Sequence, residues 1–206
     1  EGTPMSSTIG KQLELAVFGE SHGAAIGCVI NGLPAGEPLD EEQILAQMAR
    51  RAPGTDKTAT TRRESDTPEI VSGILDGRTT GAPLAMIIRN GNQRSGDYAN
   101  LARLPRPGHA DYTGYVRYNG FNDIRGGGHF SGRLTAPLTF AGAVCRQILL
   151  RRGVTVGGHI LRIADVEDDR LDPVNVSVET LEAQHTVSRR SPMEAAMATV
   201  EQARLQ

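Results

Sequence analysis

Two histidines set among glycines are the residues of this sequence best suited to proton transfer. His22 lies in the run Gly19-Glu20-Ser21-His22-Gly23, and His109 lies in the run Arg106-Pro107-Gly108-His109-Ala110-Asp111. Imidazole titrates near neutral pH, so a positioned histidine can act as an acid or a base. Neither histidine has a partner at i, i+4 or HxH spacing, which disfavours a metal site. The sequence therefore indicates acid–base chemistry, with structural histidines as the alternative.

Basic side chains gather in two glycine-containing stretches that read as loops. Guanidinium groups bind phosphate and carboxylate through paired hydrogen bonds, so an anion pocket is one interpretation and a solvated surface is the other. Nucleic acid is disfavoured because the net charge is −2 and no recognition motif is present. The basic residues are Arg50, Arg51, Lys57, Arg62 and Arg63, then Arg103, Arg106, Arg117, Arg125 and Arg133.

The run Gly126-Gly127-Gly128 frees the backbone for close approach to a ligand. Its N–H groups are available to an anion, and a predicted helix begins within a few residues. Helix starts attract phosphate. This context predicts that the phosphate of a cofactor or substrate binds here, whereas three glycines alone would also suit a hinge.

Ser21 supports a competing interpretation, because Gly19-Glu20-Ser21-His22-Gly23 also matches the G-x-S-x-G nucleophile elbow of α/β-hydrolases. That elbow needs a strand before the serine and a helix after it. Residues 24–30 look extended instead, and only one short strand precedes the motif. A serine hydrolase that uses Ser21 is therefore the weaker alternative.

The elements that must position these residues are a mixture of strands and helices. A capping box with Asp40 as N-cap begins a helix over 40–51, and Gly153 ends a second helix over 135–152. A helix is expected after His109 and another from Ser191, and residues 55–66 read as a long loop. Hydrophobic periodicity predicts strands over residues 13–18, 24–31, 70–75, 84–88 and 154–166.

Composition places the chain among globular cytoplasmic proteins. Its 206 residues suit about one domain, with 22% charged and 38% hydrophobic residues. Cys28 and Cys145 cannot form a disulfide framework. No apolar run approaches the roughly 18 residues of a membrane span, and no leader is apparent, so no membrane partner is expected. Residues 1–4 are expected to be foreign to the native sequence, ahead of a start-like Met5, with one domain over 5–206.

Several motifs occur in the order seen in the chorismate synthase family, which the chain resembles from Ser7 to about Gln202. The two histidine-bearing motifs are long and specific. The motifs are Thr8-Ile9-Gly10, Phe18 to Gly23, Arg50-Arg51 with Pro53-Gly54, Arg62-Arg63-Glu64-Ser65-Asp66, Gln93-Arg94-Ser95 with Asp97-Tyr98, Arg106 to Thr113, and Arg125 to Gly128.

This resemblance implies an α+β fold, a β-α-β sandwich with a mostly antiparallel sheet packed on core helices, assembled as a homotetramer. The chain would be the N-terminal portion of the family's usual length, incomplete at its C-terminus. The implied activity is a lyase of the shikimate pathway, in which 5-enolpyruvylshikimate 3-phosphate loses phosphate by 1,4-elimination to give chorismate. Reduced FMN is required without net redox change, and NADPH is the reductant in members that reduce their own flavin.

The resemblance also implies residue roles. His22 would act as an acid near the departing phosphate, and His109 would protonate or poise the flavin. No metal is implied. An alternative is a non-catalytic fragment that only binds anions. Substrate or NADP contacts are implied for Ser21, Arg50, Arg51, Lys57 and Arg133, and FMN contacts for Gly128, His129, Phe130 and Ser131.

The stretch after the glycines departs from the pattern of many family members, which have Arg-Ser-Ser-Ala-Arg-Glu-Thr there. This chain has His129-Phe130-Ser131-Gly132-Arg133-Leu134-Thr135. The serine, arginine and threonine that match are kept. Either the flavin contact is weakened, or the chain represents a subtype in which His129 replaces the arginine.

Overall fold

A computed structural model describes residues 7–52, 66–91, 104–158, 161–163, 166–167 and 170–183. These residues form two compact units. The described residues up to Val144 belong to the first unit, and those from Cys145 onward belong to the second. Helix α3 (Thr135–Arg151) begins in the first unit and ends in the second.

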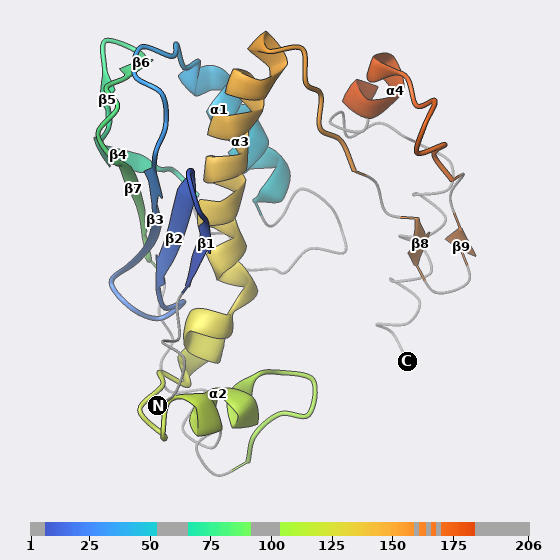
Figure 1. Ribbon diagram of the computed structural model, residues 1–206. Coiled ribbons are helices and arrows are strands. Elements are labelled where there is room, and N and C mark those ends of the chain that lie inside the picture. Colours follow the sequence, from blue (N-terminus) through green and yellow to red (C-terminus); the bar gives the residue numbers. More distant parts are fainter. Residues whose placement is uncertain are drawn as a thin grey trace. The chain divides into compact units, whose positions relative to one another are not determined.

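A five-stranded antiparallel sheet forms one layer of the first unit. The strand order is β1-β2-β3-β7-β4, and helices α1 (Glu41–Arg51) and α3 lie on the same side of this sheet (Figure 1). The described part of this unit therefore holds one sheet layer and one helix layer. The strands are β1 (Thr8–Gly10), β2 (Glu14–Gly19), β3 (Ala25–Asn31), β7 (Leu84–Arg89) and β4 (Glu69–Ser72).

The core lies on one face of this sheet, because side chains on a strand alternate between faces. On β3 and β7, Cys28 pairs with Met86, and both are fully buried. The Cys28 thiol donates to the carbonyl of Pro137 on α3 at 3.5 Å, so this face packs against α3. The other buried residues of this core include Ile26, Ile30, Leu84 and Ile88 of the sheet, Ile44 and Met48 of α1, and Phe140 and Val144 of α3.

Short elements complete the first unit. The hairpin of β5 (Ile74–Leu75) and β6 (Arg78–Thr79) lies between β4 and β7 in sequence. Helix α2 (Asp111–Arg117) follows His109. Two 3₁₀ segments, η2 (Arg125–Phe130) and η3 (Gly132–Leu134), lead directly into α3.

Besides the end of α3, the second unit contains two-residue strands and one short helix among its described residues. Strands β8 (Arg162–Ile163) and β9 (Val166–Glu167) pair with each other, and α4 (Val178–Ala183) follows. Arg146 and Glu182 lie 3.9 Å apart. No described helix of the chain has the length and apolar character needed to cross a membrane.

Most predicted elements are confirmed to within one or two residues. The mixed α+β class and the antiparallel sheet are confirmed, as are the strands over 13–18, 24–31 and 84–88 and the helices over 40–51 and 135–152. Asp40 caps α1 by accepting from the Gln43 backbone N–H at 3.2 Å. The helix expected after His109 is α2. The helix expected from Ser191 and loop residues 55–65 lie outside the described residues.

Two strand predictions were wrong, and glycine accounts for both. The strand over 70–75 stops at Ser72, because Gly73 turns the chain with a φ of +90° into the separate β5–β6 hairpin. The strand over 154–166, expected with a kink at Gly157-Gly158, does not form: residues 154–158 are not in a strand, and β8 pairs with β9 instead. Gly157 and Gly158 offer no side chain to pack, which weakens a strand at this point.

Met86→Ala is expected to lower the free energy of unfolding by about 3 kcal/mol, because removing a fully buried side chain leaves a cavity. The matched control is Val71→Ala on β4, where the side chain is 61% exposed and the change should stay near 0.5 kcal/mol. Urea denaturation followed by circular dichroism measures both variants. Equal losses would contradict the assignment of this sheet face as the core.

Candidate active site around a triple glycine

Three successive glycines bring the two predicted histidines to one place. Gly126, Gly127 and Gly128 have φ angles of +61°, +91° and +54°, which favour glycine over any residue with a side chain. A Cβ on Gly126 would overlap the ring of His22, and a Cβ on Gly127 would overlap the ring of His109. Both imidazoles therefore contact adjacent positions of one backbone turn.

Hydrogen bonds to the backbone fix the loop that carries His22. The Ser21 N–H donates to the Gly128 carbonyl at 3.1 Å, and the Ser21 hydroxyl donates to the Arg125 carbonyl at 3.2 Å. From the end of β7, the Asn90 amide donates to the carbonyls of Glu20 and Gly23 at 3.0 and 2.9 Å. His22, which is buried, is thus held by contacts on both sides of its loop.

His109 lies beside a carboxylate that an arginine keeps ionised. The Arg106 guanidinium donates two hydrogen bonds of 2.8 Å to Asp111, and the Arg106 backbone N–H adds a third at 2.9 Å. These bonds lower the pKa of Asp111 to about 2. Its Oδ1 lies 3.6 Å from Nδ1 of His109, close enough to attract a protonated imidazole. Asp111 was not among the predicted site residues, although it stands inside the His109 motif.

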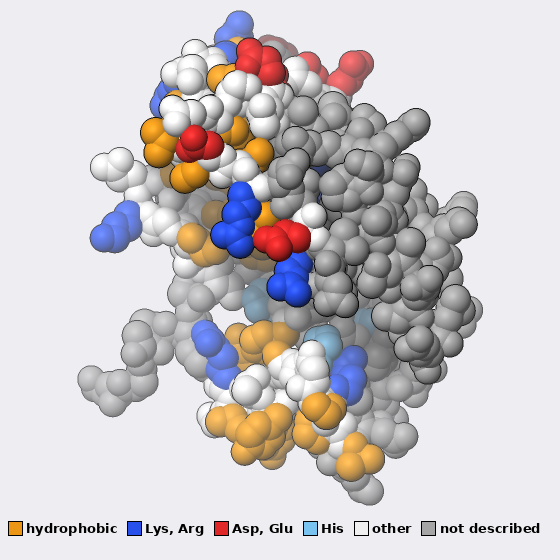
Figure 2. All heavy atoms as spheres, turned by 90° about the vertical axis from the view of Figure 1, so that its right-hand side faces the viewer, with side chains coloured by type: hydrophobic (Ala, Val, Ile, Leu, Met, Phe, Trp, Pro, Cys, Tyr) orange, Lys and Arg blue, Asp and Glu red, His pale blue; other side chains and the backbone are white. Residues whose placement is uncertain are grey.

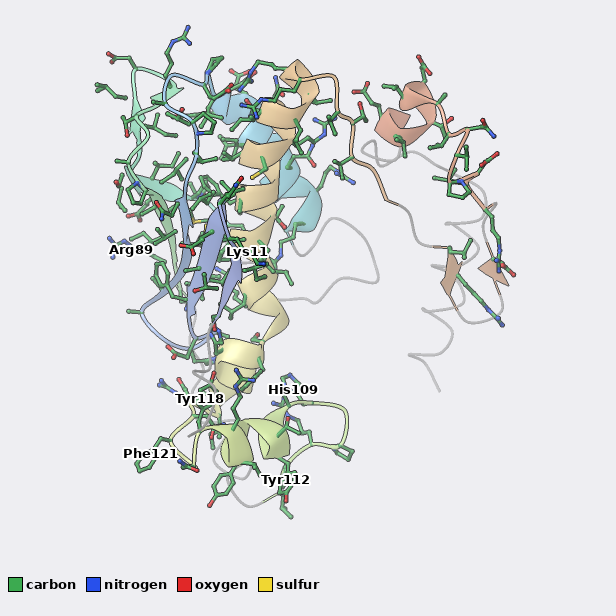
Figure 3. All side chains as sticks on the ribbon, viewed as in Figure 1. Lys11, Arg89, His109, Tyr112, Tyr118 and Phe121 are labelled. Carbon is green, nitrogen blue, oxygen red and sulfur yellow. The ribbon has the colours of Figure 1, made fainter. Side chains whose placement is uncertain are left out.

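Helix α2 buries Asp111 and Gly114 on one side and exposes its tyrosines on the other. Figure 3 shows His109 between α2 and the start of α3, whereas Tyr112 and Phe121 point away from them. Phe121 is 91% exposed, and Tyr112 and Tyr115 are also exposed. The same short helix therefore separates a histidine facing the glycine turn from an exposed aromatic surface.

Two of the predicted anion-binding arginines meet on a buried carboxylate. Asp66 accepts from Arg51 through Oδ2 and from Arg133 through Oδ1. Arg51 also donates to the Thr135 hydroxyl at 3.1 Å and to the Gly132 carbonyl at 3.3 Å. This arrangement joins the end of α1 to the start of α3. Asp66 was not predicted as a site residue, because in the sequence it is only the last residue of a polar loop and of the Arg62–Asp66 motif.

The other predicted anion contacts are placed differently. Arg50 donates to the Gln47 side chain at 2.7 Å on the exposed side of α1, away from the Asp66 pair. Lys57 lies outside the described residues. The Ser21 hydroxyl lies 3.2 Å from Nδ1 of His22, at the glycine turn. Figure 2 shows Lys and Arg side chains (blue) on several sides of histidine side chains (pale blue) on one face of the molecule.

Two of the four residues predicted to contact FMN, His129 and Phe130, line a cavity of about 330 Å³, whereas Gly128 and Ser131 do not. Both ring nitrogens of His129 are engaged, one with the Ser7 hydroxyl and one with the Gly19 carbonyl, each at 2.8 Å. The ring of Phe130 lies 5.9 Å from that of Tyr118, and the Ser131 hydroxyl accepts from the Arg133 N–H at 3.2 Å. The cavity is lined by Ser7, Val17, Phe18, Gly19, Glu20, Tyr118, Phe121, Asn122, Asp123, His129 and Phe130.

This cavity is aromatic and acidic. Its ionisable side chains besides Tyr118 and His129 are the carboxyls of Glu20 and Asp123. Hydrogen bonds from the Arg125 side chain lower the pKa of Asp123, so that carboxyl carries a negative charge at neutral pH. The aromatic side chains of the cavity suit a planar ring. Among the described residues, its lining includes no Lys or Arg that could bind a phosphate.

The site does not match the nucleophile elbow of a serine hydrolase. Ser21 is followed by strand β3 rather than by the helix that a nucleophile elbow requires. Among the described residues, no group of three or more His, Cys, Asp or Glu side chains could hold a metal ion.

Asp111→Asn is expected to lower the free energy of unfolding by about 2 kcal/mol at pH 7, because the depressed pKa reflects stabilisation of the folded state. This stabilisation is present above about pH 4 and is lost as the pH falls through about 2. Urea denaturation of both proteins should therefore give curves of stability against pH that converge below about pH 4. A difference independent of pH would contradict the assignment.

Gly127→Ala is expected to displace the His109 ring and to destabilise the fold by about 1–3 kcal/mol, because the new Cβ overlaps that ring and requires a strained φ. Gly132→Ala is the matched control, since no heavy atom lies within 4 Å of its added Cβ. The His109 ring signals in NMR spectra, together with the melting temperature, measure the effect. Unchanged His109 signals in Gly127→Ala would contradict the packing described above.

Comparisons with known proteins identify the family of this chain. The chorismate synthase family model matches residues 13–205. Chorismate synthases of Thiobacillus denitrificans and Burkholderia mallei are 51% and 49% identical over 162 residues, which cover 78% of this chain and 44% of each relative. A crystal structure of chorismate synthase aligns with a TM-score of 0.47 and 32% identity, over 69% of this chain and 36% of that chain. The chain thus spans less than half the length of these relatives, and it belongs to the chorismate synthase family.

Proposed function

We propose that this chain carries the acid–base and part of the anion-binding machinery of a chorismate synthase. The reaction is the 1,4-elimination of phosphate from 5-enolpyruvylshikimate 3-phosphate, which gives chorismate. The observation that carries this proposal is the packing of His22 and His109 against adjacent glycines. Membership of the family supports the choice of substrate.

His22 is the proposed acid at the departing phosphate. A phosphate leaves more readily when its developing charge meets a proton and fixed hydrogen-bond donors. Asn90 connects the His22 loop to Arg133, because its amide holds the loop while its Oδ1 accepts from Arg133 Nε at 3.3 Å. The phosphate and two carboxylates of the substrate would then bind to Arg51 and Arg133, with Ser21, Arg50 and Lys57 as further proposed contacts.

His109 is the proposed group that holds a proton beside the cofactor. Reduced FMN, when bound, supplies electron density transiently to the elimination. The ionised Asp111 supports this role, because its Oδ1 lies 3.6 Å from Nδ1 of His109 and offers a fixed negative charge beside the ring.

The residues after the glycines fit part of this cofactor. Gly128, Phe130 and Ser131 are proposed contacts for the flavin ring. We assign His129 to holding the loop through Ser7 and Gly19, since both of its ring nitrogens are used there. Among the described residues, the lining of the neighbouring cavity has no Lys or Arg to bind the FMN phosphate. That group is therefore proposed to bind outside this cavity.

The remaining properties follow from the family. NADPH is the proposed source of electrons for the flavin if this protein reduces its own cofactor. A homotetramer in the cytoplasm is the proposed assembly, with a small anionic molecule as the binding partner.

His22→Ala and His109→Ala are expected to lower the rate of phosphate release by about 10²- to 10⁴-fold, the usual contribution of a positioned acid or base. The assay uses the substrate with reduced FMN under anaerobic conditions. Val174→Ala, on an exposed loop of the second unit, is the control and should leave the rate unchanged.

Isothermal titration calorimetry with the same substrate separates two outcomes. Binding together with phosphate release supports the lyase. If the wild-type protein binds the substrate but releases no phosphate, the chain is an anion-binding fragment and the catalytic proposal is wrong.

A further inference from the structure

We propose that Asp66 is a positioning residue for the substrate, and that it acts by holding Arg51 and Arg133 in one fixed orientation. This inference rests on the proposed function, because it assigns these two arginines to the anionic groups of the substrate. Asp66 itself is not expected to touch the substrate.

The contacts of Asp66 divide its carboxylate between two chain segments. One oxygen accepts from Arg51 at the end of α1, and the other accepts from Arg133 just before α3. The Asp66 side chain is 3% exposed, so water competes little for these bonds. Charge-assisted bonds in such surroundings are strong and directional. Each guanidinium is therefore bonded to a carboxylate oxygen that solvent scarcely reaches.

Charge within this cluster favours an additional anion. Arg51, Arg133 and Asp66 together carry a formal charge of +1, because the two guanidinium groups share the Asp66 carboxylate. The side chain of Arg51 is 21% exposed, compared with 7% for Arg133 and 3% for Asp66. An anion that approaches the cluster from solvent therefore meets a guanidinium before it meets the carboxylate.

The cluster is also connected to the proposed acid. Arg133 donates to Asn90 at 3.3 Å, and Asn90 donates to the loop carbonyls on either side of His22. Holding Arg133 thus holds one side of the loop that presents His22. Asp66 would thus fix the positions of the two arginines and of the His22 loop relative to one another, although it lies far from either histidine in sequence.

A purely stabilising Asp66 and a positioning Asp66 differ in their effect on anion affinity. Asp66→Asn keeps the size of the side chain and raises the cluster charge from about +1 to about +2. Bulk electrostatics then predicts tighter anion binding. Loss of orientation predicts weaker binding, so the two explanations have opposite signs.

The experiment measures the dissociation constant of 5-enolpyruvylshikimate 3-phosphate by isothermal titration calorimetry, with inorganic phosphate as a second probe. Asp66→Asn is expected to raise this constant by about 10- to 100-fold, the range for loss of a charge-assisted hydrogen bond. Asp66→Glu keeps the charge but shifts the carboxylate by one methylene, and it should raise the constant several-fold. Glu69→Gln is the matched control, because it also removes one carboxylate charge from an ion pair with an arginine, but both side chains of that pair are exposed.

Each result decides between these explanations. Unchanged or tighter binding in a folded Asp66→Asn variant overturns the inference, and so does unchanged binding in Asp66→Glu if Asp66→Asn fails to fold. Unfolding of both variants, seen by circular dichroism, assigns Asp66 a stabilising role and also overturns it. If the wild-type protein binds no substrate, the proposed function itself fails. If the wild type and Asp66→Asn bind equally, only the role of Asp66 fails.

Discussion

A backbone turn that only glycine adopts readily is the constraint on which the proposed site depends. With no Cβ at Gly126 and Gly127, the rings of His22 and His109 reach the main chain directly. The same turn offers the Gly128 carbonyl to the Ser21 N–H, which ties the His22 loop to it. The turn then continues through the 3₁₀ segments into α3, whose first half packs on the sheet. The positions of both imidazoles are therefore set by the core and not by the surface loops alone.

The composition of the arginine-rich stretches suggested a strongly positive surface, but several of these arginines are paired with carboxylates. Arg106, Arg125 and Arg133 each bond to a carboxylate, and Arg117 lies over the ring of Tyr118 at 5.8 Å. Such pairing orients guanidinium groups while it limits the local excess of positive charge. A small ligand with a defined arrangement of anionic groups suits this design better than a long polyanion does. The net charge of −2 agrees with that conclusion.

Local pattern predicted the elements of the first unit well, because periodicity and capping act over few residues. Helix α1 and its cap at Asp40 are an example. The two histidines were also found, since glycine neighbours and motif order mark them. Asp66 and Asn90 were missed because their importance comes from partners distant in sequence, such as Arg133. The residues alone left structural histidines open as an alternative, and it took the tertiary contacts with the glycine turn to bring the two rings together.

The exposed face of α2 gives the molecule an intrinsic optical reporter. The chain has no tryptophan and four tyrosines, so its near-ultraviolet emission comes from tyrosine alone. Tyr112 and Tyr115 belong to α2 and Tyr118 ends it, whereas Tyr98 lies outside the described residues. The buried aromatic ring of α3 is Phe140, and phenylalanine fluoresces only weakly. Three of the four tyrosines therefore lie in the segment beside His109, and the signal from these three would report a local opening of α2 separately from melting of the sheet.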